Sequence, residues 1–111
     1  MDRMPGAERA IVEWPKVAEY LLSPLHDVGY KKAAFFGRIG YSQSNAGELI
    51  DRLLDVAVIG SLAETVVDEY GIRYVVDGLL PARGRPPVPL RTIWIVERGR
   101  HHPRFITAYP V

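Results

Sequence analysis

The sequence predicts an α+β domain in which N-terminal helices pack on one face of a four-stranded antiparallel sheet. Apolar residues recur at helical spacing over about residues 12–60, and at a spacing of two over about residues 61–110. The connections between the later segments are short, which favours an antiparallel meander. A chain of 111 residues is long enough for one hydrophobic core and too short for two. We therefore expect a single domain spanning residues 1–111.

Three stretches of the first part have helical periodicity: WPKVAEYLL, KKAAFFGRIGY and SNAGELIDRLLDVAVIG. The expected inward-facing residues are, in order, Trp14, Val17 and Leu21; Ala33, Phe36 and Ile39; Leu49, Leu53 and Val56. Ser44 or Asn45 is suited to cap the start of the third helix, and Gly60 is suited to end it.

Four later stretches are expected to be strands, and Gly71 and two turn-rich runs separate them. The four strands are expected at 62–71, 72–80, 90–97 and 104–110.

The last two strands predict a hairpin in which the numbers of paired residues sum to 201. That register places Ile93, Ile95, Ile106 and Ala108 toward the helices, with a Glu97–Arg104 charge pair at the end. A slip of one residue would bury the hydroxyls of the terminal strand, which is costly without hydrogen bonds. The face away from the helices is therefore expected to bear Thr92, Trp94, Phe105, Thr107 and Tyr109. These side chains either form a ligand-binding surface or simply cover a solvated sheet face.

Composition narrows the possible functions. The chain has no cysteine, which excludes disulfides, thiol catalysis and zinc–thiolate sites. No apolar run approaches the ~20 residues that span a bilayer, and no signal-peptide pattern begins the chain, so we expect a cytoplasmic protein without membrane contact. His101 and His102 are adjacent in a loop, where their side chains point apart, and we expect neither a metal nor another cofactor.

The charge is divided unevenly along the chain. Residues 1–80 carry a net charge of −4 and residues 81–111 a net charge of +5, all of the basic residues in the latter segment being arginine. Arginine suits bidentate contact with phosphate, so the C-terminal part is expected to meet an anionic partner.

Several stretches resemble a family of small bacterial proteins known as a domain of unknown function: YLLSPLHDVGYKKAAFFGRIGY, YGIRYVVDGLL, RTIWIVERG and PRFITAYP. The closing threonine–alanine–tyrosine–proline also resembles the last strand of the barnase–EndoU–colicin–RelE ribonuclease superfamily. That resemblance implies a barnase-like or RelE-like fold. It also implies metal-independent RNA cleavage by a bacterial toxin or effector, which a small inhibitor or antitoxin protein holds in check.

The resemblance also implies the residues of the site. His26, Lys32, Thr107 and Tyr109 occupy the family's motif positions and are the expected catalytic residues, with Lys31 beside Lys32 leaving open which lysine faces the cleft. A histidine transfers protons near neutral pH, and cations stabilise the charge that develops on phosphate. The expected nucleic-acid-binding residues are Arg73, Arg83, Arg85, Thr92, Trp94, Arg98, Arg100 and Arg104.

Other interpretations stay open for the same residues. His26 is also placed to end one helix and begin the next, Lys31 and Lys32 to cover a helix surface, and Arg73 to pair with Asp77. For the whole chain, the alternative to an RNA endonuclease is a non-catalytic module of a bacterial defence or phage system. Such a module would bind nucleic acid or protein through the same sheet face.

Overall fold

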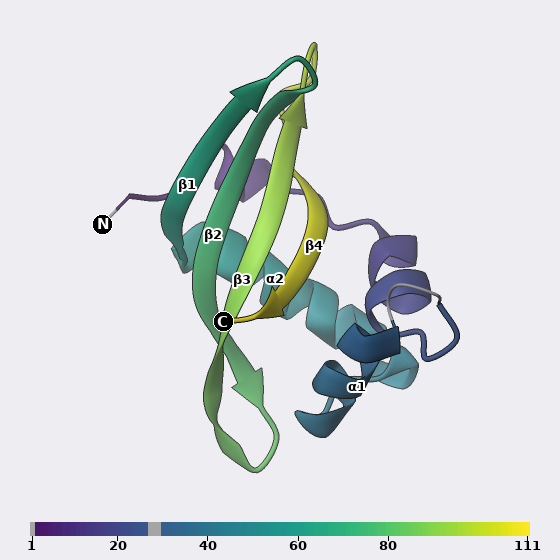
Figure 1. Ribbon diagram of the computed structural model, residues 1–111. Coiled ribbons are helices and arrows are strands. Elements are labelled where there is room, and N and C mark those ends of the chain that lie inside the picture. The colour runs from purple at the N-terminus through teal and green to yellow at the C-terminus, as the bar shows by residue number, and fades with distance from the viewer. Residues whose placement is uncertain (1, 27–29) are drawn as a thin grey trace.

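The computed structural model describes residues 2–26 and 30–111. Its sheet has four antiparallel strands in the order β1-β2-β3-β4, namely β1 (Ser61–Asp68), β2 (Gly71–Ala82), β3 (Arg85–Glu97) and β4 (Arg104–Pro110). The helices precede the sheet in the chain and lie on one of its faces (Figure 1). The predicted α+β class and the antiparallel four-stranded sheet are thus confirmed.

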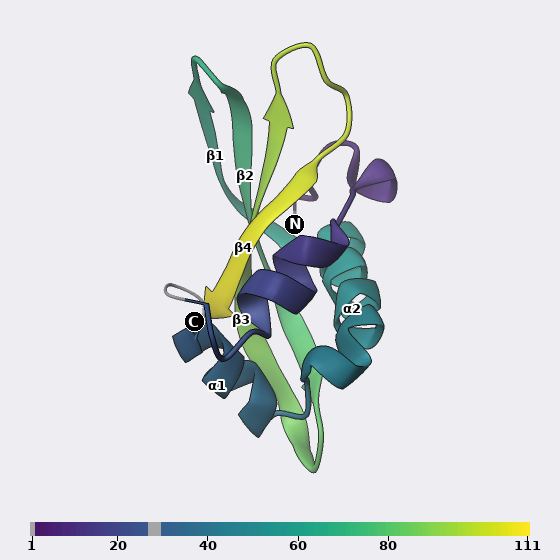
Figure 2. The ribbon, with the colours of Figure 1, turned by 90° about the vertical axis from the view of Figure 1, so that its right-hand side faces the viewer.

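The helical part contains two α-helices, α1 (Tyr30–Arg38) and α2 (Ala46–Ile59). Three shorter turns accompany them: the 3₁₀ turns η1 (Ala7–Arg9) and η3 (Gln43–Asn45), and the π-helical η2 (Lys16–Leu21). Figure 2 shows η2 beside β4 and α2 farther back on the same side of the sheet. Asn45 precedes α2, but its side chain accepts the N–H of Ser42 and donates to the carbonyl of Gly40 rather than capping α2.

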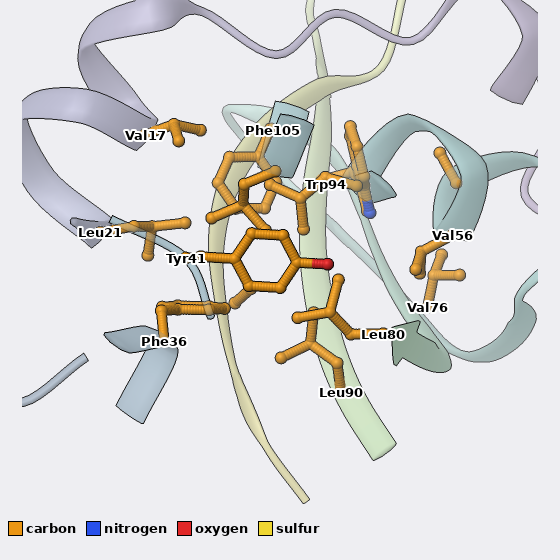
Figure 3. Close-up of a cluster of buried hydrophobic side chains, with 14 of the residues drawn as sticks. Val17, Leu21, Phe36, Tyr41, Val56, Val76, Leu80, Leu90, Trp94 and Phe105 are labelled. Atoms are coloured by element: carbon orange, nitrogen blue, oxygen red, sulfur yellow. The ribbon is translucent and has the colours of Figure 1, made fainter. Parts of the chain in front are cut away.

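The core lies between the sheet and the helices (Figure 3). Val17 and Leu21 of η2, Phe36 of α1, and the row Leu49, Leu53 and Val56 of α2 are buried, as their periodicity predicts. Ile39 is buried as well, whereas Ala33 is only half-buried and Trp14 is 54% exposed. The sheet contributes Val76, Leu80, Leu90, Trp94 and Phe105 to the same core.

The predicted register of the last hairpin is wrong. Thr92 pairs with Ala108 and Trp94 with Phe105, and β4 carries one extra residue, Ile106, between these pairs. This bulge turns Phe105 and Ala108 together toward the core.

The two faces of β3 are consequently exchanged relative to the prediction. Thr92 and Trp94 face the helices and are fully buried, whereas Ile93 and Ile95 pair with Thr107 and Arg104 on the opposite face. Burial of Thr92 carries little cost because its hydroxyl donates to the carbonyl of Val76 at 2.8 Å and accepts the indole N–H of Trp94 at 2.7 Å.

The N-terminal segment and η2 cover part of the β4 edge of the sheet. At β4, Ile11 makes a one-residue parallel bridge: its N–H donates to the carbonyl of Pro103, and its own carbonyl accepts the N–H of Phe105. η2 covers the adjoining part of β4. The candidate site therefore lies where the N-terminal segment and η2 meet this edge.

Candidate functional site

A cleft of about 480 Å³ lies between η2 and β4. Its lining residues are Glu13, Pro15, Lys16, Tyr20, His26, Ile106 and Thr107. Neighbouring residues of a regular strand point to opposite faces. Ile106 and Thr107 nevertheless both line the cleft, at the place where the bulge at Ile106 interrupts the alternation. The cleft thus combines an apolar wall with groups able to donate, accept or carry a proton.

Tyr20 links the cleft's polar groups. Its ring meets the imidazole of His26 edge-on, with the ring centroids 5.1 Å apart. Its hydroxyl lies 3.3 Å from the hydroxyl oxygen of Thr107, and the ammonium of Lys16 lies 5.8 Å from its ring centroid. One aromatic side chain therefore connects His26, at the end of the helical entry, to Thr107 in the terminal strand.

Lys32 reaches the same strand from α1. Its ammonium donates to the carbonyl of Ala108 at 3.4 Å and lies 5.3 Å from the ring centroid of Tyr109. Of the two adjacent lysines, Lys32 is half-buried and directed at β4, whereas Lys31 is exposed. The structure thus brings the four predicted catalytic residues, His26, Lys32, Thr107 and Tyr109, to the C-terminal half of β4.

Arg91 adds a second cationic group, a guanidinium, beside Tyr109, its cross-strand partner. Both carboxylate oxygens of Asp77 accept hydrogen bonds from Arg91, each at 2.7 Å. The hydrogen bond from Arg91 lowers the pKa of Asp77, and Asp77, followed by Tyr109, raises the pKa of Arg91. Arg91 therefore remains a fixed positive group next to the terminal tyrosine.

The predicted nucleic-acid-binding residues do not form one patch. Arg73 pairs with Asp68 at 3.1 Å rather than with Asp77, and Arg104 lies between Glu97 at 3.1 Å and Glu13 at 3.5 Å. Thr92 and Trp94 are buried in the core, so their prediction as surface contacts is wrong.

The remaining four arginines are exposed at opposite ends of β3. Arg83 and Arg85 belong to the β2–β3 hairpin, and Arg98 and Arg100 follow the other end of β3. Since a strand rises ~3.3 Å per residue, roughly 40 Å of backbone separates these two pairs.

Sequence reasoning missed Tyr20, Lys16 and Arg91 as members of the site. Tyr20 begins the YLL motif, which was the available signal. Lys16 and Arg91 have no such motif, and only their contacts with Tyr20 and Tyr109 reveal them. Within residues 2–26 and 30–111, no three His, Asp or Glu side chains gather as metal ligands would. No helix in that part of the chain is long and apolar enough to cross a bilayer.

Together, the cleft and the helix-backed sheet define an α+β protein with a polar site at the edge of its open sheet. The same fold occurs in a chain of a contact-dependent growth inhibition toxin–immunity protein complex from Klebsiella pneumoniae 342. The two chains superpose with a TM-score of 0.70 at 16% sequence identity, over 91% of this chain and 99% of that one.

The chain itself belongs to the family described as domain of unknown function DUF6883, whose model matches residues 3–111. The resemblance to a family of that kind is thereby confirmed. A comparison with curated proteins found no match.

Proposed function

We propose that this protein is a toxin-type RNA endonuclease that cleaves by attack of the 2′-hydroxyl on the neighbouring phosphate. The main observation that supports this proposal is that four side chains from separate parts of the chain come together around β4, namely His26, Lys32, Thr107 and Tyr109. The fold shared with a chain of a toxin–immunity protein complex supports the same function. So does the resemblance of the terminal motif to the barnase–EndoU–colicin–RelE superfamily.

The cleft, together with Lys32 and Tyr109 at the adjoining end of β4, has the groups that this reaction needs. His26 accepts the proton of the 2′-hydroxyl as the 2′-oxygen bonds to phosphorus. The bond from phosphorus to the 5′-oxygen then breaks, and that oxygen takes a proton from an acid of the same cleft, for which Tyr20 and Lys16 are placed. Lys32 and the hydroxyls of Thr107 and Tyr109 stabilise the charge on the phosphate oxygens. The product is a 2′,3′-cyclic phosphate.

A protein inhibitor is part of the proposal. An active ribonuclease harms the cell that makes it, and the structural relative was determined as a toxin–immunity protein complex. We propose that this protein acts in the cytoplasm, where its RNA substrate is found. We also propose that residues 1–111 form a single domain that contains both the cleft and the sheet.

The test is cleavage of single-stranded RNA by the purified protein in excess chelator. We expect 2′,3′-cyclic phosphate ends, and a loss of rate of ~100-fold or more in His26→Ala, the usual scale for losing a proton-transfer group. His102→Ala is the matched control, because His102 lies in the β3–β4 loop outside the cleft. Its rate should stay near that of the wild type.

Two further variants separate the hydroxyls from the histidine. Thr107→Val and Tyr109→Phe each remove one hydroxyl and keep the bulk of the side chain, so they should lower the rate with little change in melting temperature. If folded wild-type protein, free of inhibitor, cuts no RNA, the chain is a non-catalytic binding module. An equal loss of rate in His26→Ala and His102→Ala would exclude His26 from proton transfer.

A further inference from the structure

Two segments far apart in the sequence are rich in cations and free of carboxylates. Residues 30–47 include Lys31, Lys32 and Arg38, residues 78–91 include three arginines, and neither segment contains Asp or Glu. The fold joins them: the N–H of Arg83 donates to the carbonyl of Ile39 at 2.9 Å, and the hydroxyl of Tyr41 donates to the carbonyl of Pro81 at 2.8 Å. Positive charge therefore accumulates where α1 ends against the β2–β3 hairpin.

The β2–β3 hairpin forms a projecting arm, residues 78–89. β1 stops pairing with β2 at Asp77, and β4 stops pairing with β3 at Leu90, so the arm continues beyond both neighbours (Figure 1). Four prolines stiffen its backbone, and Leu80 anchors its base in the core.

Close backbone packing fixes the arm against the helical part. Gly40 has a φ of +105°, and a Cβ there would lie 2.9 Å from the Cβ of Arg83. Gly40 therefore permits both the turn after α1 and the approach of the arm. Arg83 is held against the end of α1, Arg85 pairs with Ala82 across the hairpin, and both arginines are exposed.

Helix α1 connects the arm to the candidate site. Lys32, near its start, contacts Ala108 and Tyr109, and Ile39, just after its end, binds Arg83. At ~1.5 Å per residue, the backbone of Lys32 lies about 10 Å from that of Ile39. Arg38, Arg83 and Arg85, which we call the arm–α1 strip, thus lie beyond Lys32, in the direction from the site to the arm.

The opposite end of the sheet has no such excess of positive charge. Arg73 and Arg104 are paired with carboxylates there. Arg98 lines a hollow with Asp68 and Glu97, and Arg100 lines another with Glu13 and Glu97. These carboxylates offset the arginines. On the arm side Glu48 lines a hollow with Arg83, but the six cations of the two segments outnumber Glu48 and Asp77, the partner of Arg91, so a polyanion meets more positive charge there.

We propose that the arm–α1 strip binds the phosphate backbone of the RNA substrate beyond the nucleotides that are cut. This inference rests on the proposed ribonuclease function and adds to it the kind of substrate. At a rise of ~3.4 Å per nucleotide in a stacked strand, the ~10 Å from Lys32 to Ile39 corresponds to roughly three nucleotides, and Arg83 and Arg85 belong to the arm that begins there. The preferred substrate is accordingly a longer RNA rather than a di- or trinucleotide.

The experiment compares two double variants of equal charge change. Arg83→Gln with Arg85→Gln alters the arm, and Arg98→Gln with Arg100→Gln alters the opposite end. We expect the arm variant alone to raise KM for a 20-nucleotide RNA by about tenfold, equivalent to 1.4 kcal/mol, with kcat and the rate on a trinucleotide unchanged. Binding of the same RNA is then measured in protein inactivated by His26→Ala. The slope of log binding constant against log salt concentration changes by ~0.7 for each phosphate contact with single-stranded RNA, so the two arm substitutions should reduce its size by about 1.4.

Equal effects of the two double variants on the 20-nucleotide RNA would overturn the proposal. So would an equal fall in trinucleotide cleavage, since the strip would then act within the cleft. Failure of the wild type to cut either RNA refutes the proposed function, and the salt slopes then still decide whether the strip binds RNA. No RNA binding by any variant at low salt overturns both proposals.

Discussion

At the scale of single residues, Thr92 shows how a polar side chain is accommodated in the core. Its hydroxyl makes both of its hydrogen bonds inside the protein, one to the carbonyl of Val76 and one from the indole of Trp94. The indole in turn packs edge-on against Phe105 with the ring centroids 5.3 Å apart. The hydroxyl therefore holds Trp94 in the orientation that the β3–β4 packing requires.

Thr92→Val tests this role because it preserves shape and removes the hydroxyl. The indole N–H of Trp94 would lose its acceptor, and a buried unsatisfied group costs about 1–3 kcal/mol. We expect urea denaturation to show a loss of unfolding free energy of that size. Thr92→Ser keeps the hydroxyl and should lose about 1 kcal/mol for the missing methyl group. An unchanged midpoint in Thr92→Val would show that the hydrogen bonds contribute nothing net.

At the scale of elements, α2 packs closely against β2 at Gly78. A Cβ on Gly78 would lie 2.8 Å from a methyl carbon of Val56, so the absence of a side chain sets how closely helix and strand approach. Gly47, in the first turn of α2, has no atom within 4 Å of its equivalent position. The two glycines therefore offer the same substitution in a crowded and an open setting.

We expect Gly78→Ala to destabilise the protein by about 1–3 kcal/mol, the usual cost of overpacking a core. Gly47→Ala should stabilise it by up to about 1 kcal/mol, because alanine favours the helix and no atom opposes it. Thermal unfolding measures both, and a 1 kcal/mol change in a domain of this size corresponds to ~4 °C. A stabilising Gly78→Ala would mean that α2 shifts to admit the methyl group at no cost.

The elements could be predicted from the sequence far better than their register. Leu49, Leu53 and Val56 are buried as their spacing indicates, because a long amphipathic helix repeats its signal every turn. The extra residue at Ile106 has no comparable signal, since strict alternation and a bulge both fit RFITAYP. One undetected bulge, together with the internal hydrogen bonds of Thr92, reversed the predicted faces of β3.

At the scale of the whole molecule, the division of charge along the sequence did not predict where the positive side chains lie in the fold. The arginines of residues 81–111 are spread over both ends of the sheet, and carboxylates from earlier segments pair with Arg91 and Arg104. The surface that we propose for phosphate binding lies instead where residues 30–47 meet residues 78–91, and this long-range contact has no local sequence signal. The proposed catalytic residues were predicted through family motifs, whereas their convergence around β4 could be seen only in the fold.

The whole chain should unfold as one cooperative unit, because its buried cluster includes Met4 of the N-terminal segment, residues of every helix except η3, and three of the strands. The two tryptophans report different places: Trp94 is fully buried in the core, and Trp14 is 54% exposed. In Trp14→Phe, fluorescence therefore comes from Trp94 alone, while far-UV circular dichroism follows helices and strands together. We expect both signals to change with a single, coincident urea midpoint. Separate midpoints would instead mean that the helical part and the sheet fold independently, so the cleft between η2 and β4 would lie between two units rather than within one.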